Sequence, residues 1–280
     1  MSKLFGVIGD PISQSMSPTI HNTAFHTYQI DAHYHAFQVS KKNLKEAVEG
    51  MRALNISGFN VTIPHKESIM PFLDEVDPLA LEIGAVNTVV NQGGRLRGYN
   101  TDGSGFVRSL NEALSTSIGN QQILVVGAGG ASRAIIFALQ QAGAITIDII
   151  NRTKEKAEDL LSVVGNINGE ALSLHEAHQI SKKYDILIQT SPIGMYPNVE
   201  NQPLILNKLV YNHSIVCDII YNPIKTAFLS EAKQLGLNTV DGVGMFVYQA
   251  TLAFELWTGI NPDPHPLKNI VYQHLGGSSC

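Results

Sequence analysis

The amino-acid sequence predicts an α/β protein of two domains. The chain has 280 residues, more than one core usually organises, so two domains of roughly 100–150 residues each are expected. Short apolar runs alternate with helical patterns along the first hundred residues, a rhythm typical of a mainly parallel sheet covered by helices. A second alternating block follows the polar stretch 115–122.

The N-terminal block contains the elements of the first predicted domain. We expect strands at 4–9, 34–39, 58–63 and 85–91, and helices at 18–28, 44–54 and 103–114. The strands are short apolar runs, whereas apolar residues recur with helical spacing in the helices. The domain boundary falls within 100–120, and the first domain is assigned residues 1–102.

The second block has the same alternation and predicts another parallel sheet. We expect strands at 123–126, 145–150, 185–189, 215–220 and 238–240, and helices at 131–142 and 226–235. This domain is assigned residues 103–242. Helices at 245–257 and 265–274 follow it, and we expect residues 243–275 to join the first domain. The tail 276–280 is predicted to be disordered.

Composition limits the partners of the chain. Its net charge of −5, from 19 basic and 24 acidic residues, argues against nucleic acid and anionic lipid as partners. Cys217 and Cys280 are too few for a disulfide framework, and no apolar run reaches the roughly 18 residues of a membrane span. We therefore expect a cytoplasmic monomer or homodimer with a small-molecule substrate and no metal site.

A glycine-rich turn joins the strand 123–126 to the next helix. It comprises Gly127, Ala128, Gly129, Gly130 and Ala131. Such a turn is typical of a Rossmann-like dinucleotide-binding domain, because the glycines permit a tight turn and let a pyrophosphate approach the helix N-terminus. The next residue along is a serine where a third glycine often stands, which is a mild departure from the pattern. The competing interpretation is a turn that binds no ligand.

The end of the next strand favours NADP over NAD. An NAD-binding domain places a carboxylate there for the ribose 2′-hydroxyl, whereas this strand ends in Asn151, Arg152 and Thr153. A guanidinium suits a 2′-phosphate. Lys156 either adds a second positive contact or is a solvated helix lysine, and Asp148 lies too early in the strand to reach the ribose.

Other residues are predicted to line the cofactor at the carboxyl edge of this sheet. Thr190, Ser191 and Met195 follow the strand 185–189, where ligands of such sheets gather. We place them on the nicotinamide side, with an ordinary loop as the alternative. Ile219 and Gly242 complete the predicted cofactor-binding set.

Hydride transfer to a ketone builds negative charge on the oxygen, so the first domain must supply a proton donor or a fixed cation. Lys66 follows the strand 58–63 and is predicted to fill this role. Asn60 and Thr62 share one face of that strand, while Val61 and Ile63 share the other. A solvated lysine at a turn is the competing interpretation.

Further polar residues stand where segments begin or end. Asn87 belongs to the strand 85–91, and Asp102 precedes the helix 103–114. Asp102 is either an N-cap or a carboxylate that pairs with Lys66 and accepts from a substrate hydroxyl. Ser15 and Ser17 precede the helix that begins at residue 18, where they suit a substrate carboxylate, although Ser17 alone is equally consistent with an N-cap.

Together these segments resemble the shikimate dehydrogenase family, from about residue 5 to residue 249. The matching motifs, in chain order, are Ser15-Met-Ser17-Pro18, Asn60-Val-Thr-Ile-Pro-His-Lys66, Gly84-Ala-Val-Asn-Thr88, Asn100-Thr-Asp102-Gly103, Gly127-Ala-Gly-Gly-Ala131, Asn151-Arg-Thr153 and Asp241-Gly-Val-Gly-Met245. The resemblance implies NADPH-dependent, reversible reduction of 3-dehydroshikimate to shikimate, a step toward the aromatic amino acids.

The same resemblance implies roles for individual residues. It makes Lys66 and Asp102 the catalytic pair and places Ser15 and Ser17 at the substrate carboxylate. It also implies a set of residues that hold the ring hydroxyls and the carboxylate: Asn60, Thr62, Asn87, Tyr221 and Gln249.

Several alternatives stay open. A related enzyme that prefers quinate or uses NAD would share the fold and the catalytic pair. A ligand-sensing module should have lost Lys66 or Asp102, and a methylenetetrahydrofolate dehydrogenase would not need the paired serines. His21 and His65 are other conceivable acids, but among ten histidines a structural role is the more frequent one.

Overall fold

The computed structural model describes residues 2–177, 179 and 181–276. The chain divides into two compact units, which we call unit 1 (Met1–Asp102 with Gln249–Val271) and unit 2 (Gly103–Tyr248 with Tyr272–Cys280). The second break falls inside one continuous helix, α9 (Gly242–Thr258), which therefore contributes residues to both units. Most of the tail predicted to be disordered, residues 277–280, lies outside the described residues.

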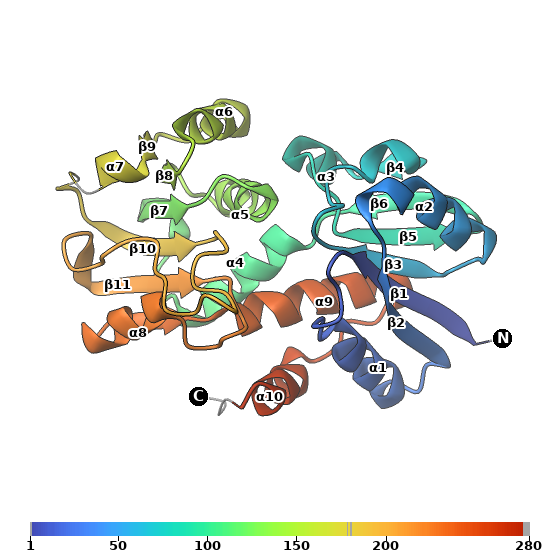
Figure 1. The fold of residues 1–280 in the computed structure, drawn as a ribbon. Helices are drawn as coiled ribbons and strands as arrows, with labels where there is room; N and C mark the ends of the chain where they lie inside the picture. The colour runs from blue at the N-terminus through green and yellow to red at the C-terminus, as the bar shows by residue number, and fades with distance from the viewer. Residues whose placement is uncertain (1, 178, 180, 277–280) are drawn as a thin grey trace. The chain divides into compact units, whose positions relative to one another are not determined.

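Unit 1 is built on one sheet with strand order β2-β1-β3-β5-β6-β4 (Figure 1). Its strands and helices before α9 are β1 (Lys3–Gly9), α1 (Ser17–Thr27), β2 (Ala32–Gln38), the 3-10 turn η1 (Lys41–Asn43), α2 (Leu44–Ala53), β3 (Gly58–Val61), η2 (Met70–Phe72), β4 (Glu75–Val76), α3 (Pro78–Ile83), β5 (Thr88–Gln92) and β6 (Arg95–Tyr99). The pairs β1–β2, β1–β3 and β4–β6 are parallel, whereas β3–β5 and β5–β6 are antiparallel.

The antiparallel part of this sheet differs from the predicted strands. The predicted strand 85–91 begins only at Thr88, and the following strand β6 was not predicted. A two-residue turn joins β5 to β6, and both of its residues, Gly93 and Gly94, have positive φ, the conformation that such tight hairpins require. Asn91 Oδ1 accepts from Gly94 N–H at 2.8 Å and closes the turn.

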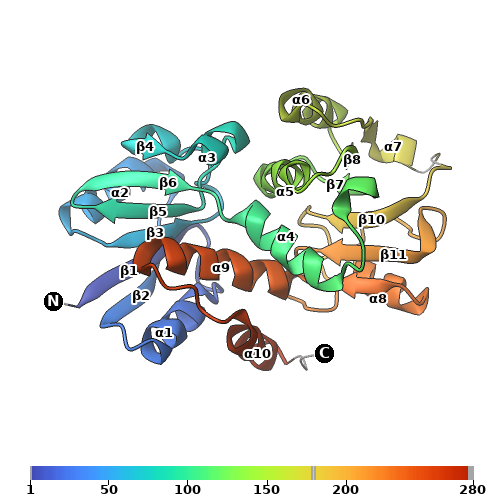
Figure 2. The ribbon, with the colours of Figure 1, turned by 180° about the vertical axis from the view of Figure 1, so that it is seen from behind.

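Helices cover both faces of the unit 1 sheet. Because side chains alternate along β1, Phe5 and Val7 face one layer and Ile8 faces the other. α1 and α9 lie on the face of Phe5 (Figure 2). There, Phe25 of α1 meets Phe254 of α9 with ring centroids 5.1 Å apart. Residues of α2 and α3 pack on the opposite face. Two buried apolar layers therefore hold the strands that carry the polar residues described below.

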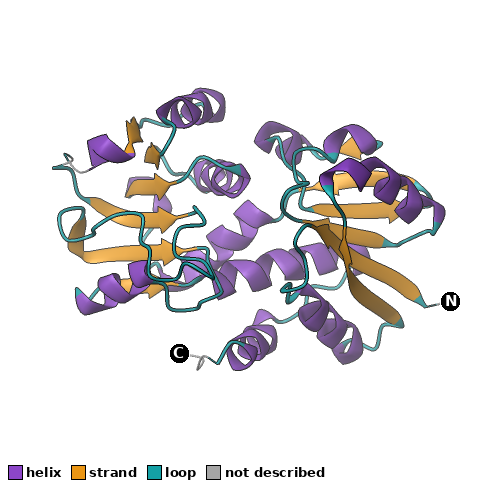
Figure 3. Ribbon diagram, in the orientation of Figure 1, coloured by secondary structure: helices purple, strands orange, loops and turns teal. Residues whose placement is uncertain are grey.

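Unit 2 is built on a parallel sheet with strand order β12-β11-β10-β7-β8-β9 (Figure 3). Besides the first half of α9, its elements are α4 (Asp102–Ala113), the 3-10 turn η3 (Ile118–Asn120), β7 (Gln122–Val126), α5 (Gly130–Gln141), β8 (Thr146–Asn151), α6 (Lys154–Val164), β9 (Ala171–Ser173), α7 (Leu174–Ala177), β10 (Tyr184–Gln189), β11 (Val210–Asp218), α8 (Ala227–Gln234) and β12 (Asn238–Val240). The last helix of the chain is α10 (Pro264–His274). The prediction gave no bounds for α6, although it expected Lys156 to lie in a helix, and it missed β9 and α7, which have only three and four residues.

The strand order of this sheet indicates where a ligand is expected to bind. The chain runs outward from β7 to β8 and β9 in one direction, and then through β10, β11 and β12 in the other. The point where the order reverses lies between β7 and β10, and ligands of such sheets bind beyond the carboxyl ends of the strands at this point. Within the described residues, no helix has both the length and the apolar character that crossing a bilayer demands.

Candidate active site

Lys66 and Asp102 form an ion pair in unit 1. Lys66 Nζ lies 2.7 Å from Asp102 Oδ2, and the two side chains are 21% and 8% exposed. The Lys66 carbonyl oxygen accepts from Val86 N–H at 2.8 Å, which ties this loop to the segment before β5. A charge-assisted hydrogen bond between partly buried groups is stronger than a surface ion pair. The interpretation of Lys66 as a solvated lysine is therefore wrong.

Asp102 is the first residue of α4 rather than its N-cap. Its own N–H donates to Asn100 Oδ1 at 3.0 Å. Its carboxylate oxygens accept instead from Lys66 and from Asn87, whose Nδ2 lies 2.8 Å from Oδ1. Two donors from different segments thus fix the plane of the Asp102 carboxylate, and its remaining lone pairs can accept from a ligand hydroxyl.

Asn87 is only 2% exposed, and its amide group is fully engaged inside unit 1. Nδ2 donates to Asp102 and, at 2.9 Å, to Thr101 Oγ1. Oδ1 accepts from Thr101 N–H at 2.8 Å and from Thr88 Oγ1 at 2.9 Å. An amide has two donors and two acceptor lone pairs, so these four bonds occupy all of them, and a longer contact of 3.2 Å also joins Thr101 Oγ1 to Oδ1. Asn87 orients Asp102 in this arrangement.

Asn60 connects to this cluster through the pairing of β3 with β5. Asn60 lies opposite Thr88 in the antiparallel register, and its Nδ2 donates to Thr88 Oγ1 and to the Asn87 carbonyl oxygen, both at 3.1 Å. The predicted alternation along residues 58–63 stops early, because β3 ends at Val61 and Ile63 is 70% exposed. Ile63 therefore does not share a buried face with Val61.

The predicted carboxylate-binding serines lie at the start of α1. Met16 is the N-cap and Ser17 the first helical residue, so Ser17 is not the cap and Pro18 is the second residue of the helix. Ser17 N–H donates to Ser15 Oγ at 3.3 Å. Ser17 is buried and Ser15 is partly buried, so Ser15 has the more accessible hydroxyl.

The two histidines considered as acids are both buried in unit 1. Burial lowers the pKa of His21 to about 3, which keeps its ring neutral at physiological pH. Its ring stacks on that of Tyr34 with centroids 4.4 Å apart. His65 is fully buried, and its Nε2 lies 2.6 Å from the Val39 carbonyl oxygen. Both residues therefore have structural contacts that account for their presence.

In unit 2, the glycine turn between β7 and α5 has the geometry that a dinucleotide needs. Gly127 has φ +116°, and a Cβ there would lie 2.5 Å from Thr190 Oγ1. Gly129 is the N-cap of α5, and a Cβ there would meet no atom within 4 Å. The backbone is therefore tight at Gly127 and open at Gly129, so a pyrophosphate has room beside the first N–H groups of the helix.

Ser132 stabilises this turn in place of a third glycine. Its Oγ accepts from Gly129 N–H at 3.2 Å and lies 2.6 Å from Thr190 Oγ1. Thr190 Oγ1 in turn donates to the Val126 carbonyl oxygen at 2.7 Å. These contacts join the end of β10 to the glycine turn. In the sequence this serine is only a mild departure from the glycine pattern, although a hydroxyl three residues after an N-cap signals this bond.

The side chains predicted to select the cofactor follow β8. Arg152 and Lys156 are exposed, and in the part of the chain that the structure describes neither side chain has an ion-pair partner. Lys154, between them, is bound to Glu176 at 2.7 Å. Asp148 is buried within β8 and accepts from Lys182, at 2.7 Å, and from other groups. Arg152 and Lys156 are therefore available to bind a phosphate group on the ribose, and the Asp148 carboxylate, which is already hydrogen-bonded, is not available to repel it.

The other predicted cofactor and substrate residues are distributed over both units. Thr190, Ser191, Met195 and Ile219 follow β10 and β11, and Gly242 N–H donates to the Ile220 carbonyl oxygen at 3.3 Å. Tyr221 belongs to unit 2, where its ring stacks on Phe246 with centroids 4.5 Å apart, and burial raises its pKa. Thr62 and Gln249 belong to unit 1, and both are partly buried.

Three family models match consecutive parts of the chain. The model described as the shikimate dehydrogenase substrate binding domain matches residues 7–89. The model described as shikimate / quinate 5-dehydrogenase matches residues 109–203, and that of the shikimate 5′-dehydrogenase C-terminal domain matches residues 242–272. The first of these ranges lies in unit 1 and the second in unit 2.

Similar proteins cover nearly the whole chain. A curated protein of Bacillus anthracis named shikimate dehydrogenase (NADP(+)) is 53% identical over 99% of this chain and 100% of its own. The crystal structure of shikimate 5-dehydrogenase from Listeria monocytogenes in complex with shikimate and NAD has a TM-score of 0.89 at 36% identity and covers 96% of each chain. The enzyme from Thermus thermophilus in complex with NADP(H) and shikimate has a TM-score of 0.87 at 34% identity, over 97% of this chain and 99% of that chain.

Proposed function

Because this chain belongs to the shikimate dehydrogenase family, we propose that it reduces 3-dehydroshikimate to shikimate with NADPH, reversibly, as a step toward the aromatic amino acids. Unit 1 is proposed to bind the substrate and unit 2 the cofactor. The observation that carries this proposal is the Lys66–Asp102 ion pair, with Nζ and Oδ2 2.7 Å apart and held by Asn87.

The chemistry needs a fixed positive charge beside the ketone. Bound NADPH supplies the hydride that reduces the ketone carbon. As the carbonyl becomes an alcohol, negative charge develops on its oxygen, and we propose that the Lys66 ammonium stabilises this charge. Asp102 fixes the ammonium and keeps lone pairs for a neighbouring ring hydroxyl. The same contacts serve the reverse reaction, in which the hydroxyl loses its proton.

Substrate binding is proposed to use two groups of polar residues. Ser15 and Ser17 are assigned to the carboxylate, because hydroxyl groups at the start of a helix suit an anion. Five residues are assigned to the ring hydroxyls and the carboxylate: Asn60, Thr62, Asn87, Tyr221 and Gln249. Asn87 can take part only by exchanging one of the four bonds it already makes.

Cofactor binding is proposed to use the glycine turn and the segment after β8. The Gly130 N–H is assigned to the pyrophosphate, which approaches the backbone at Gly129, and Arg152 and Lys156 are assigned to the 2′-phosphate. The remaining residues assigned to the cofactor are Gly127, Ala128, Ala131, Asn151, Thr153, Thr190, Ser191, Met195, Ile219 and Gly242. The absence of a carboxylate at the end of β8 supports NADP over NAD.

An assay of the purified chain tests the proposal. Shikimate with NADP+ should generate reduced cofactor, measured by its absorbance, and quinate or NAD+ in separate reactions should be used less well. Failure to oxidise shikimate with either cofactor would refute the proposed reaction. Faster turnover with NAD+ than with NADP+ at equal concentration would refute the cofactor assignment alone. We propose that the enzyme acts in the cytoplasm, as a monomer or homodimer.

A further inference from the structure

We propose that Tyr34 is a positioning residue of the active site, which acts by donating a hydrogen bond to Asn60 and so fixes the group that Asn60 presents to the substrate. This inference rests on the proposed function, because it assigns Asn60 to substrate binding. Tyr34 lies in β2, at the edge of the unit 1 sheet, and is 3% exposed. Its hydroxyl donates to Asn60 Oδ1 at 2.7 Å.

The direction of this bond follows from the other bonds of Asn60. The Nδ2 group donates to Thr88 Oγ1 and to a backbone carbonyl oxygen, and a carbonyl can only accept. Oδ1 must therefore face Tyr34, and Tyr34 must be the donor. Burial raises the pKa of Tyr34 well above its usual value, so the hydroxyl keeps its proton. Both Nδ2 protons are used, so Asn60 binds a substrate hydroxyl as an acceptor, through the Oδ1 lone pair that the neighbouring His21 side chain otherwise engages.

The bond from Tyr34 begins a chain of donors that ends at the catalytic carboxylate. Asn60 donates to Thr88, Thr88 donates to Asn87 Oδ1, and Asn87 donates to Asp102 Oδ1. Every donor in this chain points toward Asp102, and hydrogen bonds in such a chain polarise one another. Loss of the first donor therefore weakens Asn60 most and the later members of the chain less.

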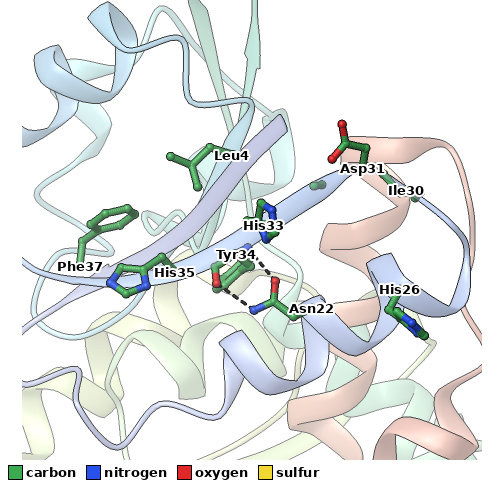
Figure 4. Close-up of a pocket in the computed structure, with 10 residues that line it drawn as sticks. Leu4, Asn22, His26, Ile30, Asp31, His33, Tyr34, His35 and Phe37 are labelled. Atoms are coloured by element: carbon green, nitrogen blue, oxygen red, sulfur yellow. Dashed lines mark hydrogen bonds between the residues drawn. The ribbon is translucent and has the colours of Figure 1, made fainter. Parts of the chain in front are cut away.

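Two neighbouring residues of α1 hold Tyr34 in place. The Asn22 side chain pairs with the Tyr34 backbone twice: Nδ2 donates to the carbonyl oxygen at 2.9 Å, and Oδ1 accepts from the N–H at 2.8 Å (Figure 4). The His21 ring stacks on the phenol ring. His21 and Asn22, which the proposed reaction does not use directly, therefore fix the position of Tyr34.

An apolar role alone does not explain this tyrosine. A phenylalanine would fill the same space against His21 and Trp257 without the cost of burying a hydroxyl. The hydroxyl donates to Asn60 and also has a hydrogen bond with the Ser17 side chain. Replacing it leaves Asn60 Oδ1 buried without its donor. A purely structural role predicts lower stability with unchanged kinetics, whereas a positioning role predicts a specific change in substrate binding.

The experiment compares Tyr34→Phe with Tyr184→Phe in the full-length protein. Tyr184 is the matched control, because it is equally buried and its hydroxyl donates at 2.8 Å to Asp148, which is not assigned to the substrate. KM for shikimate, KM for NADP+ and kcat are measured for each variant. Folding is followed by fluorescence of Trp257, the single tryptophan of the chain, which packs near Tyr34 with ring centroids 6.1 Å apart.

Tyr34→Phe should raise KM for shikimate about 10-fold, the size of one lost hydrogen bond, with KM for NADP+ unchanged. Tyr184→Phe should lose comparable stability and keep both KM values within about 2-fold of the wild type. Incorporation of 3-fluorotyrosine at position 34 keeps the donor and should restore the wild-type KM.

If the wild type oxidises shikimate and the folded Tyr34→Phe variant has the same KM for shikimate, the inference is overturned and the proposed function stays intact. A wild type that does not oxidise shikimate would overturn both. If Tyr34→Phe does not fold, the Asn22→Ala variant tests the inference instead. It removes the two hydrogen bonds from Asn22 to the Tyr34 backbone and keeps the Tyr34 hydroxyl. It should raise KM for shikimate about 3-fold, and an unchanged KM in that variant would also overturn the inference.

Discussion

At the scale of single residues, Lys66 and Asp102 owe their chemistry to their immediate neighbours. The ammonium is partly buried beside a carboxylate, and that carboxylate is oriented by an amide whose four hydrogen-bonding positions are all used inside unit 1. Arg152 and Lys156 show the opposite condition, since they are exposed cations without an ion-pair partner among the described residues. These two conditions are the reason that we propose the first pair for catalysis and the second for binding a phosphate.

Lys66→Ala should lower kcat by roughly 10²–10⁴-fold, the usual contribution of acid–base catalysis or charge stabilisation. The variant should still fold, because Lys66 belongs to neither apolar layer and Asn87 still donates to the Asp102 carboxylate. Steady-state kinetics with shikimate and NADP+ measure the change. Lys45→Ala, which removes an exposed lysine of α2, is the control for charge; near-normal turnover of Lys66→Ala would refute the catalytic role.

Arg152→Ala should raise KM for NADP+ about 10- to 100-fold, because a bidentate contact to the 2′-phosphate is lost. KM for NAD+ should change little, since NAD+ has no phosphate at that position. Lys154→Ala is the matched control: it removes the same charge from the same segment, but from a side chain already bound to Glu176. Equal loss of NADP+ and NAD+ binding in Arg152→Ala would contradict the assignment.

At the scale of elements, the turn between β7 and α5 contains two glycines that are needed for different reasons. Gly127 is needed for its left-handed conformation and for the closeness of Thr190, whereas Gly129 has extended backbone and open space around it. Ser132 and Thr190 brace the turn from the next strand of the sheet. Contacts within unit 2 therefore fix the turn at Gly127, and the space beside Gly129 is left open for the proposed ligand.

Substitution of the two glycines should separate stability from cofactor binding. Gly127→Ala should destabilise the protein by about 1–3 kcal/mol, because it strains the backbone and crowds Thr190. Gly129→Ala should leave the thermal midpoint nearly unchanged and raise KM for NADP+ at least about 10-fold, because the methyl group occupies the approach of the pyrophosphate. Thermal denaturation and KM measurements distinguish the two; wild-type cofactor affinity in Gly129→Ala would argue against a pyrophosphate there.

At the scale of the whole molecule, buried titratable groups set how stability depends on pH. Burial raises the pKa of Asp218, at the end of β11, to about 6, although Ile220 N–H and the Thr226 hydroxyl both donate to it. The folded state therefore holds a proton on Asp218 between about pH 4 and pH 6 that the unfolded chain has released. The contribution of Asp218 to the free energy of unfolding is therefore fully present at low pH and declines as pH rises through that window.

Asp218→Asn should remove this decline. The free energy of unfolding of the variant relative to the wild type should increase by about 2–3 kcal/mol between pH 4 and pH 7, the size of a two-unit pKa shift. Urea denaturation at several pH values measures it, with Asp159→Asn, at an exposed position of α6, as the control for net charge. A constant difference across this range would show that Asp218 titrates as it does in the unfolded chain.

Local patterns in the sequence were sufficient for much of the fold and the chemistry. The strand before the glycine turn and the helix after it were predicted because their signals lie within a few adjacent residues, and the choice of NADP followed from the residues at the end of one strand. The hairpin of β5 and β6 and the short elements β9 and α7 were missed or misplaced, because their apolar patterns are too short to be distinctive.

The sequence by itself determined the fold class, the family and the residue types that the reaction needs, since each of these depends on short motifs in a fixed order. Only the tertiary structure decided which residues touch: Lys66 and Asp102 are 36 positions apart, and Tyr34 and Asn60 are 26 apart. Such contacts depend on the order and register of β2, β1, β3 and β5 in the sheet. That order is set by burial of both faces of the sheet at once, a property of the folded chain that no local segment carries.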